Sequence, residues 1–130
     1  MSSPLPLDRC SVLVVEDDPI IALDLIFSLE DAGAEVHGPC VTNDRALSEI
    51  DKRVIHAAVL DVDIGNSDVS PVADALKSRG IPFVFHTGTL PQGNAVLSRS
   101  DAPVLGKPCR PEDLVAAVLK VIEKAEAGTE

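Results

Sequence analysis

The chain has 130 residues, 45% of them hydrophobic and 25% charged, which is the composition of a single ordinary globular domain. Its formal net charge of −10 argues against binding of nucleic acid or of an anionic membrane surface by this domain. No apolar run reaches the length of a membrane-spanning helix, because Asp24 interrupts the longest one.

Both ends of the chain are expected to be loose, which leaves one domain at 10–124. Residues 1–9 are rich in Pro and Ser and lack a basic, signal-like start, so they are interpreted as a flexible arm. Residues 125–130 are expected to fray. An odd number of cysteines without metal-ligand spacing favours free thiols and a cytoplasmic location; these are Cys10, Cys40 and Cys109.

The first part of the chain alternates apolar runs with amphipathic segments. Residues 11–15 form a β-branched run that predicts a strand. Asp18 suits the N-cap of a following helix, which is expected to end before Gly33. A short strand is expected at 34–38 and a second helix at 42–51.

The middle of the chain holds an apolar run at 57–60 that leads directly to Asp61. A run that is apolar throughout suits a strand buried on both faces of a parallel sheet. Asp61 then lies at the carboxyl end of the strand, where open α/β sheets place their ligands. A turn-rich loop is expected at 65–68, followed by a helix that ends at Gly80.

The last part of the chain is expected to contain the weakest helix. A strand at 82–86 ends at Thr87. The helix expected at 90–100 should be short or irregular, because this segment contains Pro, Gly and Asn. A short strand at 103–106 and a helix from 111 to about 124 complete the pattern.

Strands that alternate with helices predict an α/β fold with a parallel sheet and right-handed crossovers. Polar side chains directly follow four of the five predicted strands; these are Glu16 and Asp17, Asp61, Thr87, and Lys107. Because the carboxyl ends of parallel strands share one edge of the sheet, these side chains are expected to surround one crevice.

The residue types at this crevice suit phosphoryl chemistry with a divalent cation. Two carboxylates about 4 Å apart repel by roughly 4 kcal/mol at an effective dielectric near 20, and a cation relieves that repulsion. Oxygen ligands favour Mg²⁺. An aspartate beside Mg²⁺ can attack a phosphoryl group, and Lys107 would neutralise charge on its oxygens. Thr87 offers a hydroxyl and Gly88 a backbone N–H.

Four motifs in this order resemble the signature sites of response-regulator receiver domains; they are Val14-Val15-Glu16-Asp17, Leu60-Asp61, Thr87-Gly88 and Lys107-Pro108. The resemblance covers roughly residues 10–124. It implies a doubly wound, flavodoxin-like (βα)5 fold whose five-stranded parallel sheet has the order 2-1-3-4-5.

The resemblance also implies a role for each acidic residue of the crevice. Asp61 corresponds to the phosphoacceptor and also binds the metal. Asp17 corresponds to a direct Mg²⁺ ligand, and Glu16 to an indirect one that acts through water or through its neighbours. Asp63 corresponds to the position that offers the metal its backbone carbonyl.

On the phosphate side, the resemblance makes Thr87, with Gly88, the switch hydroxyl and Lys107 the phosphate-binding lysine. It also implies a cis bond between Lys107 and Pro108. Receivers usually carry Tyr or Phe three residues before the lysine, whereas this chain has Val104. The usual inward swing of an aromatic ring therefore cannot operate in that form.

The sequence Phe85-His86-Thr87-Gly88 resembles a receiver branch that lacks the aromatic switch and whose members often stand alone. Side chains of neighbouring strand residues point to opposite faces, so His86 is expected to point away from Thr87 and to be a partnered histidine with no catalytic role.

The predicted function is that of a stand-alone response regulator, a signalling protein and not an enzyme. A sensor histidine kinase or a phosphotransfer protein would phosphorylate Asp61, and the signal would pass to an unknown downstream protein or end in a phosphate sink. The helix predicted at 20–29 has more apolar residues than one buried face requires, so a homodimer that uses them as its interface remains an open alternative.

Two alternatives remain open at this point. The run Leu60-Asp61-Val62-Asp63 also resembles the Asp-x-Asp motif of haloacid-dehalogenase-type phosphatases, in which the second aspartate is a general acid. Against this, that motif usually ends the first strand, whereas here it ends the third. The other alternative is a receiver-like module that works by protein contact without phosphorylation.

Overall fold

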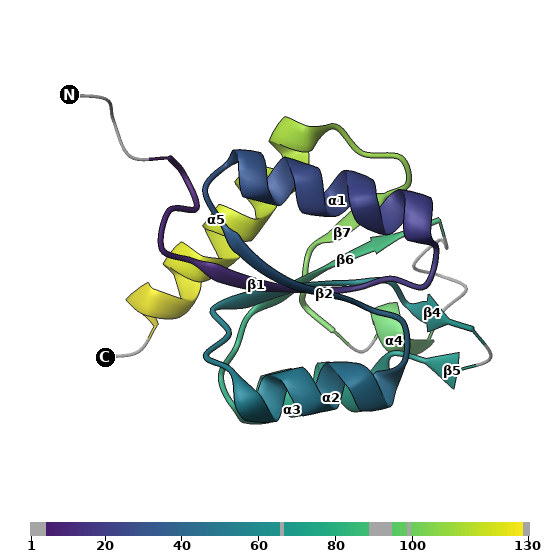
Figure 1. The fold of residues 1–130 in the computed structure, drawn as a ribbon. Coiled ribbons are helices and arrows are strands. Elements are labelled where there is room, and N and C mark those ends of the chain that lie inside the picture. Colours follow the sequence, from purple (N-terminus) through teal and green to yellow (C-terminus); the bar gives the residue numbers. More distant parts are fainter. Residues whose placement is uncertain (1–4, 66, 89–94, 99, 129–130) are drawn as a thin grey trace.

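The computed structural model describes residues 5–65, 67–88, 95–98 and 100–128, and it is built on a five-stranded parallel sheet (Figure 1). The strands of this sheet are β1 (Ser11–Val15), β2 (Glu35–Cys40), β3 (Ala57–Leu60), β6 (Phe83–Thr87) and β7 (Val104–Gly106). Their order is β2-β1-β3-β6-β7, which is the predicted order 2-1-3-4-5 once two short extra strands are set aside. The α/β prediction is therefore confirmed.

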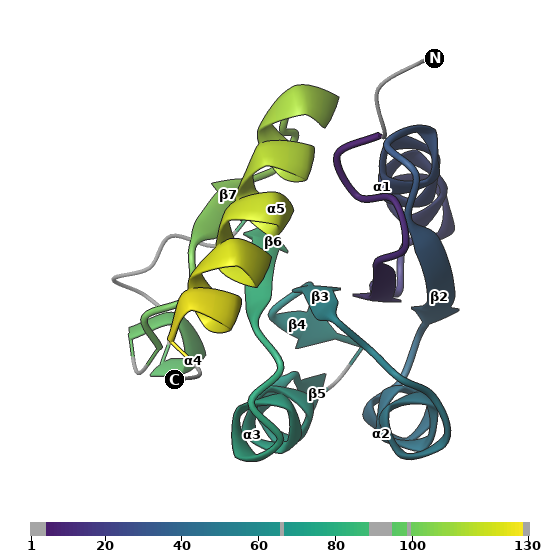
Figure 2. The same cartoon turned by 90° about the vertical axis from the view of Figure 1, so that its left-hand side faces the viewer.

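Helices cover both faces of the sheet (Figure 2). One face packs against α1 (Pro19–Asp31) and α5 (Pro111–Ala127). The other packs against α2 (Asn43–Lys52), α3 (Ser70–Ser78) and the four-residue α4 (Ala95–Ser98). The expected helix at 90–100 lies partly outside the described residues, which include 95–98 and 100 of that range.

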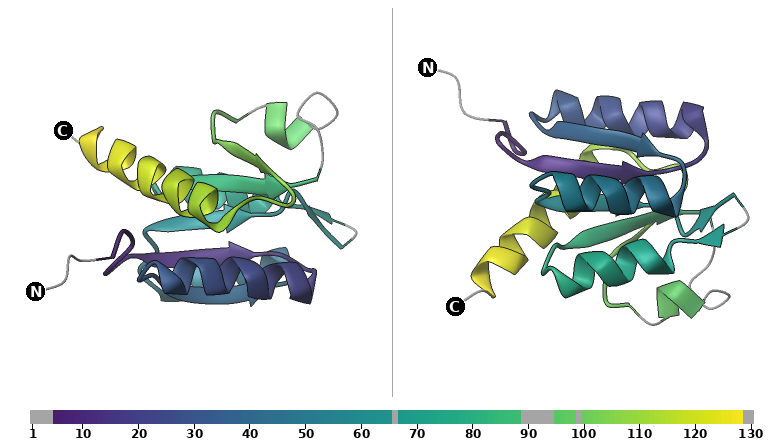
Figure 3. Two further views of the ribbon diagram at one scale, coloured as in Figure 1. Left: turned by 90° about the horizontal axis from the view of Figure 1, so that it is seen from above. Right: turned by 60° about the horizontal axis from the view of Figure 1, so that its bottom comes forward.

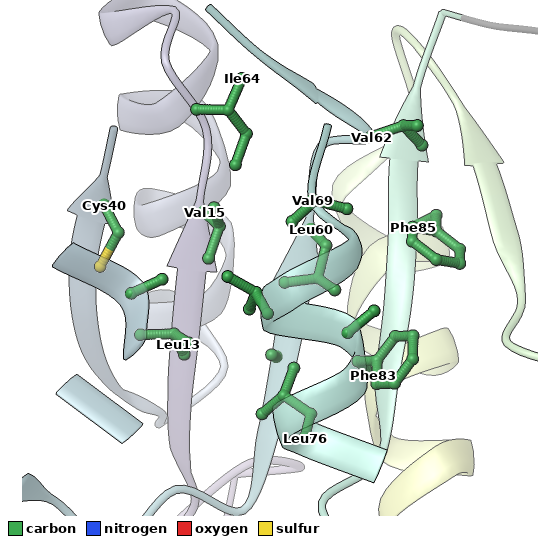
Figure 4. Packing of buried hydrophobic residues seen from close by; sticks show 14 of the residues in the cluster. Leu13, Val15, Cys40, Leu60, Val62, Ile64, Val69, Leu76, Phe83 and Phe85 are labelled. Carbon is green, nitrogen blue, oxygen red and sulfur yellow. The ribbon is translucent and has the colours of Figure 1, made fainter. Parts of the chain in front are cut away.

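The apolar runs read from the sequence become the two cores. Successive side chains of a strand point to opposite faces, so Leu13 and Val15 pack toward α2 and α3 while Val12 and Val14 pack toward α1 and α5. Figure 4 shows the first of these clusters, in which Leu60 lies beside Val15. Burial on both faces explains why β1, β3 and β6 read as apolar runs.

The start of α1 follows the predicted capping chemistry. Asp18 Oδ1 accepts hydrogen bonds from the backbone N–H groups of Ile20 and Ile21 at 2.9 and 3.3 Å. These donors have no partner within the helix, so the cap fixes where the helix begins. The turn that leads out of β1 is thereby held in one shape.

Among the described residues, two segments near the chain ends differ from the prediction. Leu7, placed by the prediction in a flexible arm at 1–9, is fully buried in the core against α1 and α5, and its N–H donates to Ala32 O at 2.8 Å. At the other end, α5 continues to Ala127, so fraying does not begin at 125. At the first end, apolar contact with the core outweighs the Pro- and Ser-rich composition. At the second, helix propensity carries α5 past residue 125.

The segment after β3, expected to be only a turn-rich loop, contains a short antiparallel hairpin of β4 (Asp63–Ile64) and β5 (Ser67–Asp68). Figure 3 shows the hairpin extending from the end of the sheet at which the strand arrows point. Within the described part of the chain, no helix is long and apolar enough to cross a membrane.

Candidate functional site

Three carboxylates meet at the carboxyl ends of β1 and β3. Each of Glu16, Asp17 and Asp61 offers a carboxylate oxygen, and the three oxygens lie within 4.8 Å of one another. The sheet itself sets this proximity, because the N–H of Asp61 donates to Val15 O at 2.9 Å and that of Glu16 to Cys40 O at 3.0 Å. The sequence prediction that these acids share one crevice is confirmed for this trio.

Lys107 closes the site from the end of β7. Its Nζ lies 3.1 Å from Asp61 Oδ2 and 3.0 Å from Glu16 Oε1, and thus bridges acids that follow two different strands. Its backbone N–H donates to Thr87 O at 3.0 Å, which ties the lysine to the end of β6. Four strands therefore deliver one lysine, one threonine and three acids to the same place.

Burial and charge compete within this group. Glu16 is only 1% exposed, and its burial, aided by repulsion from Asp61, raises its pKa although hydrogen bonds from Lys107 and from the backbone of Asp18 oppose the rise. Burial alone would lower the pKa of Lys107, but hydrogen bonds and attraction from Glu16 and Asp61 outweigh it and raise the pKa. The lysine is held in its charged form, and the pocket remains rich in negative charge.

The β4–β5 hairpin contributes a contact that the sequence did not reveal. The N–H of Gly65 donates to Asp17 Oδ2 at 2.8 Å. Gly65 has a positive φ of 61°, a conformation that glycine adopts at little cost. The side chain of Asn43, at the start of α2, donates to Asp68 O at 2.9 Å and fastens the hairpin. In the sequence, Gly65 indicated only a turn-rich loop and gave no sign that its N–H would contact Asp17.

The remaining predicted site residues lie in or directly after β4, β6 and β7. Thr87 is 3% exposed at the end of β6, and Gly88 follows it directly. The Lys107–Pro108 bond is cis, as expected. Asp63 begins β4, where its Cα is opposite that of Asp68. Val104 lies in β7 opposite Phe85 and is 37% exposed.

The donor set fits a hard divalent cation. Three carboxylates converge from the loops after β1 and β3. Among the described ion pairs, Lys107 is the only cation that pairs with them. Oxygen donors of this kind suit Mg²⁺, which usually keeps several waters and binds few protein ligands. Asp17 is exposed toward solvent, which leaves room for such waters.

His86 departs in part from its prediction, because one of its two ring nitrogens has no partner among the described residues. It is 4% exposed, but within the described residues its Nδ1 has no hydrogen-bond partner, whereas a partnered histidine was expected. Burial, followed by the positive charge of Lys107, lowers the pKa of His86. The side chain is therefore neutral at pH 7 and lines a cavity outside the acidic crevice.

Comparisons with known proteins place the chain among receivers by fold. No family model matches the chain. It is similar to a CheY-like response regulator receiver domain protein from Methanospirillum hungatei, with 26% identity and a TM-score of 0.80 over 91% of this chain and 97% of that one. It is also similar to the response regulator PhyR from Brucella abortus, with 25% identity and a TM-score of 0.80 over 94% of this chain.

Among curated proteins, the phyllosphere-induced regulator PhyR of Methylorubrum extorquens is 29% identical over 115 residues, or 85% of this chain. The chain spans 43% of the length of that relative and 51% of the Brucella protein. It therefore resembles response regulator receiver domains in fold and sequence and corresponds to only part of PhyR.

Proposed function

We propose that the chain is a phosphorelay receiver in which Asp61 accepts a phosphoryl group. The observation that carries the proposal is the bridge from Lys107 Nζ to both Asp61 and Glu16, within an acidic cluster that fits Mg²⁺. A lysine poised on an aspartate at the switch edge of a doubly wound sheet is suited to binding the oxygens of a phosphoryl group on that aspartate.

In the proposed reaction, a carboxylate oxygen of Asp61 forms a bond to phosphorus while the bond from phosphorus to the donor breaks. The leaving group departs with the bonding electron pair, so no oxidant or reductant is needed. Lys107 moves its hydrogen bond from Asp61 toward a phosphoryl oxygen, and the Thr87 hydroxyl and the Gly88 N–H bind the others. Mg²⁺, when bound by Asp17, Asp61, the Asp63 carbonyl and indirectly Glu16, would neutralise charge on the transferred group.

The proposed donor is a sensor histidine kinase or a phosphotransfer protein of the cytoplasm. The phosphorylated domain would act by changed contacts with a downstream protein or as a phosphate sink. The lever is the phosphoryl group, which puts about −1.5 to −2 charges and three acceptor oxygens in place of the single negative charge of the Asp61 carboxylate. One group per chain is accepted, without turnover of phosphate esters.

The test is intact mass spectrometry of the full chain after incubation with acetyl phosphate and Mg²⁺. We expect one phosphoryl group on the wild type and none on Asp61→Asn or on a metal-free sample. Asp63→Asn is the matched control, because only the backbone carbonyl of Asp63 has a proposed role, and it should still be phosphorylated. If Asp63→Asn abolishes a sustained turnover that the wild type performs, the Asp-x-Asp phosphatase replaces the receiver.

A second measurement tests for an aspartyl phosphate that hydrolyses before mass spectrometry detects it. Beryllofluoride with Mg²⁺ should shift the backbone amide signals of Asp61, Thr87 and Lys107 in NMR spectra of the wild type. If neither the adduct nor these shifts occur, the proposal is wrong and the contact-only module is the better description.

A further inference from the structure

A groove of about 650 Å³ lies at the amino ends of β6 and β7, at the opposite edge of the sheet from the acidic cluster. This α3–α5 groove is lined by residues within 77–83, 100–103 and 117–128. Its more buried lining residues include Phe83, which is buried, and Ile81, Ala117 and Val121, which are half-buried. The floor of the groove is therefore apolar.

Three lysines form the rim of the α3–α5 groove. Lys77, at the end of α3, and Lys120 and Lys124, on α5, are exposed and are three of the five lysines in the chain. None of the three takes part in an ion pair among the described residues. Their charges are therefore available to a partner.

The acids near this rim leave a surplus of positive charge. Among the described residues that line the groove, Asp101 is the only acid, against three lysines. Glu123 and Glu126 belong to the same half of α5 but do not line the groove. In a chain with a net charge of −10, this groove is a local region of opposite sign.

The exposed face of α1 has the complementary composition. Ile20, Leu23 and Phe27 are 80%, 54% and 63% exposed, and their spacing of three and four residues places them in one stripe along the helix. Asp24 and Asp31 are exposed four residues after Ile20 and Phe27, so they flank this α1 stripe. The helix contains no Lys or Arg. Exposed apolar patches of this kind mark interaction surfaces.

We propose that the α1 stripe of one chain docks in the α3–α5 groove of a second copy of the chain. The apolar side chains of the stripe would contact the floor of the groove, and its acids would meet the lysines of the rim. A helix that lays an apolar face in an apolar groove is a common mode of recognition, and opposite charges across the contact fix its orientation. The inference goes beyond the phosphorelay function and is testable on the unphosphorylated chain.

The proposed contact is head-to-tail, because the two surfaces differ. No residue of α1 lines the α3–α5 groove, so one chain can use both surfaces at once. Each added chain then leaves one stripe and one groove unoccupied, and association continues beyond the dimer.

The net charge of −10 on each copy opposes the association and keeps it weak. At physiological ionic strength the screening length is about 8 Å, so distant charges are screened more than the groups that meet in the groove. We therefore expect a dissociation constant of about 0.1–1 mM.

The first test is sedimentation of the full chain over a concentration range of about 0.02–2 mM. We expect the average mass to rise with concentration and to exceed that of a dimer at the upper end. In NMR spectra over the same range, the signals of α1 and those of Lys120, Val121 and Lys124 should shift together. A complex that stops at two chains and shifts only the α1 signals would be a symmetric dimer and would contradict the proposal.

Two double variants each remove one surface. Leu23→Ala with Phe27→Ala shortens the α1 stripe, and Lys120→Glu with Lys124→Glu reverses the charge of the rim. All four side chains are exposed, so both variants should fold, and each alone should associate about 10-fold or more weakly than the wild type. Lys52→Glu, at the end of α2 and outside both surfaces, is the matched control and should associate like the wild type.

Mixing the two double variants tests the head-to-tail pairing. An equimolar mixture should form a complex of two chains and no larger, because only the intact stripe of the rim variant and the intact groove of the stripe variant can meet. A mixture no heavier than the separate variants would overturn the proposal. So would a wild type that stays monomeric up to about 2 mM, which would leave both surfaces to other proteins.

Discussion

The centre and the edge of the sheet are built differently. Every residue of β3 and β6 is buried, as are four of the five residues of β1, while β7 at the edge alternates exposed and half-buried positions. The acids, Thr87 and the cavity histidine all follow or lie on central strands, and only Lys107 comes from the edge. Most of the candidate site is thus held by the strands whose residues are most completely buried.

The edge of the sheet at β7 is shorter and less buried than its centre. β7 has three residues, and the helix before it is described over only four. Val104 stands where receivers usually carry an aromatic ring, and it leaves a small side chain 37% exposed opposite Phe85. For the receiver function proposed above, this contrast predicts that a signal leaves the central site through loops and the lysine, and not through an aromatic ring packed on the edge.

The largest expected difference between the centre and the edge is in the loss of stability when one side chain is shortened in each region. Leu60→Ala removes fully buried methyl groups from β3 and should lower the free energy of unfolding by about 2–5 kcal/mol. Val104→Ala in β7 should lower it by about 0.5 kcal/mol or less. Urea unfolding of both variants measures the difference, and equal losses would contradict the comparison.

The next largest effect concerns ion pairs. Lys107→Met leaves the buried Glu16 and Asp61 without their cation, and we expect a loss of about 1–3 kcal/mol in the free energy of unfolding. The exposed pair of Arg79 and Asp51 is the control. Arg79→Met should cost less than about 1 kcal/mol because solvent already screens that pair. Thermal unfolding of the two variants in the same buffer is the measurement.

Mg²⁺ should stabilise the folded chain through the acidic cluster at the centre of the sheet and through no other region. At a Mg²⁺ concentration ten times the dissociation constant, binding to the folded state adds about 1.4 kcal/mol. Calorimetry should show a higher Tm for the wild type and for Asp31→Asn, whose carboxylate lies at the far end of α1. Asp17→Asn should lose most of the gain. An equal gain in Asp17→Asn would place the ion elsewhere.

The smallest expected effect is a pH dependence that comes from His86. Burial lowers its pKa in the folded state, so the unfolded chain takes up the proton first as the pH falls. The stability contributed by neutral His86 is complete above the unfolded pKa of about 6.5 and is lost as the pH falls through the lower folded pKa. Urea midpoints at pH 7.5 and 5.5 should therefore differ less in His86→Phe than in the wild type.

Much of the fold and of the candidate site follows from local features of the sequence. Period and composition gave the five strands of the sheet, the cap at Asp18, and the carboxylates and lysine at the strand ends, because those features depend on local chemistry and on the rule that parallel strands end at one edge. Asp61 was identifiable as the centre of the site because an apolar strand runs directly into it.

Only the tertiary structure decided the features that depend on contacts between distant segments. Leu7 is buried against α1 and α5, Gly65 meets Asp17 because the β4–β5 hairpin brings it to the loop after β1, and among the described residues His86 Nδ1 has no hydrogen-bond partner. Each results from packing between residues far apart in the chain. Periodicity within a window of the sequence carries no information about that packing.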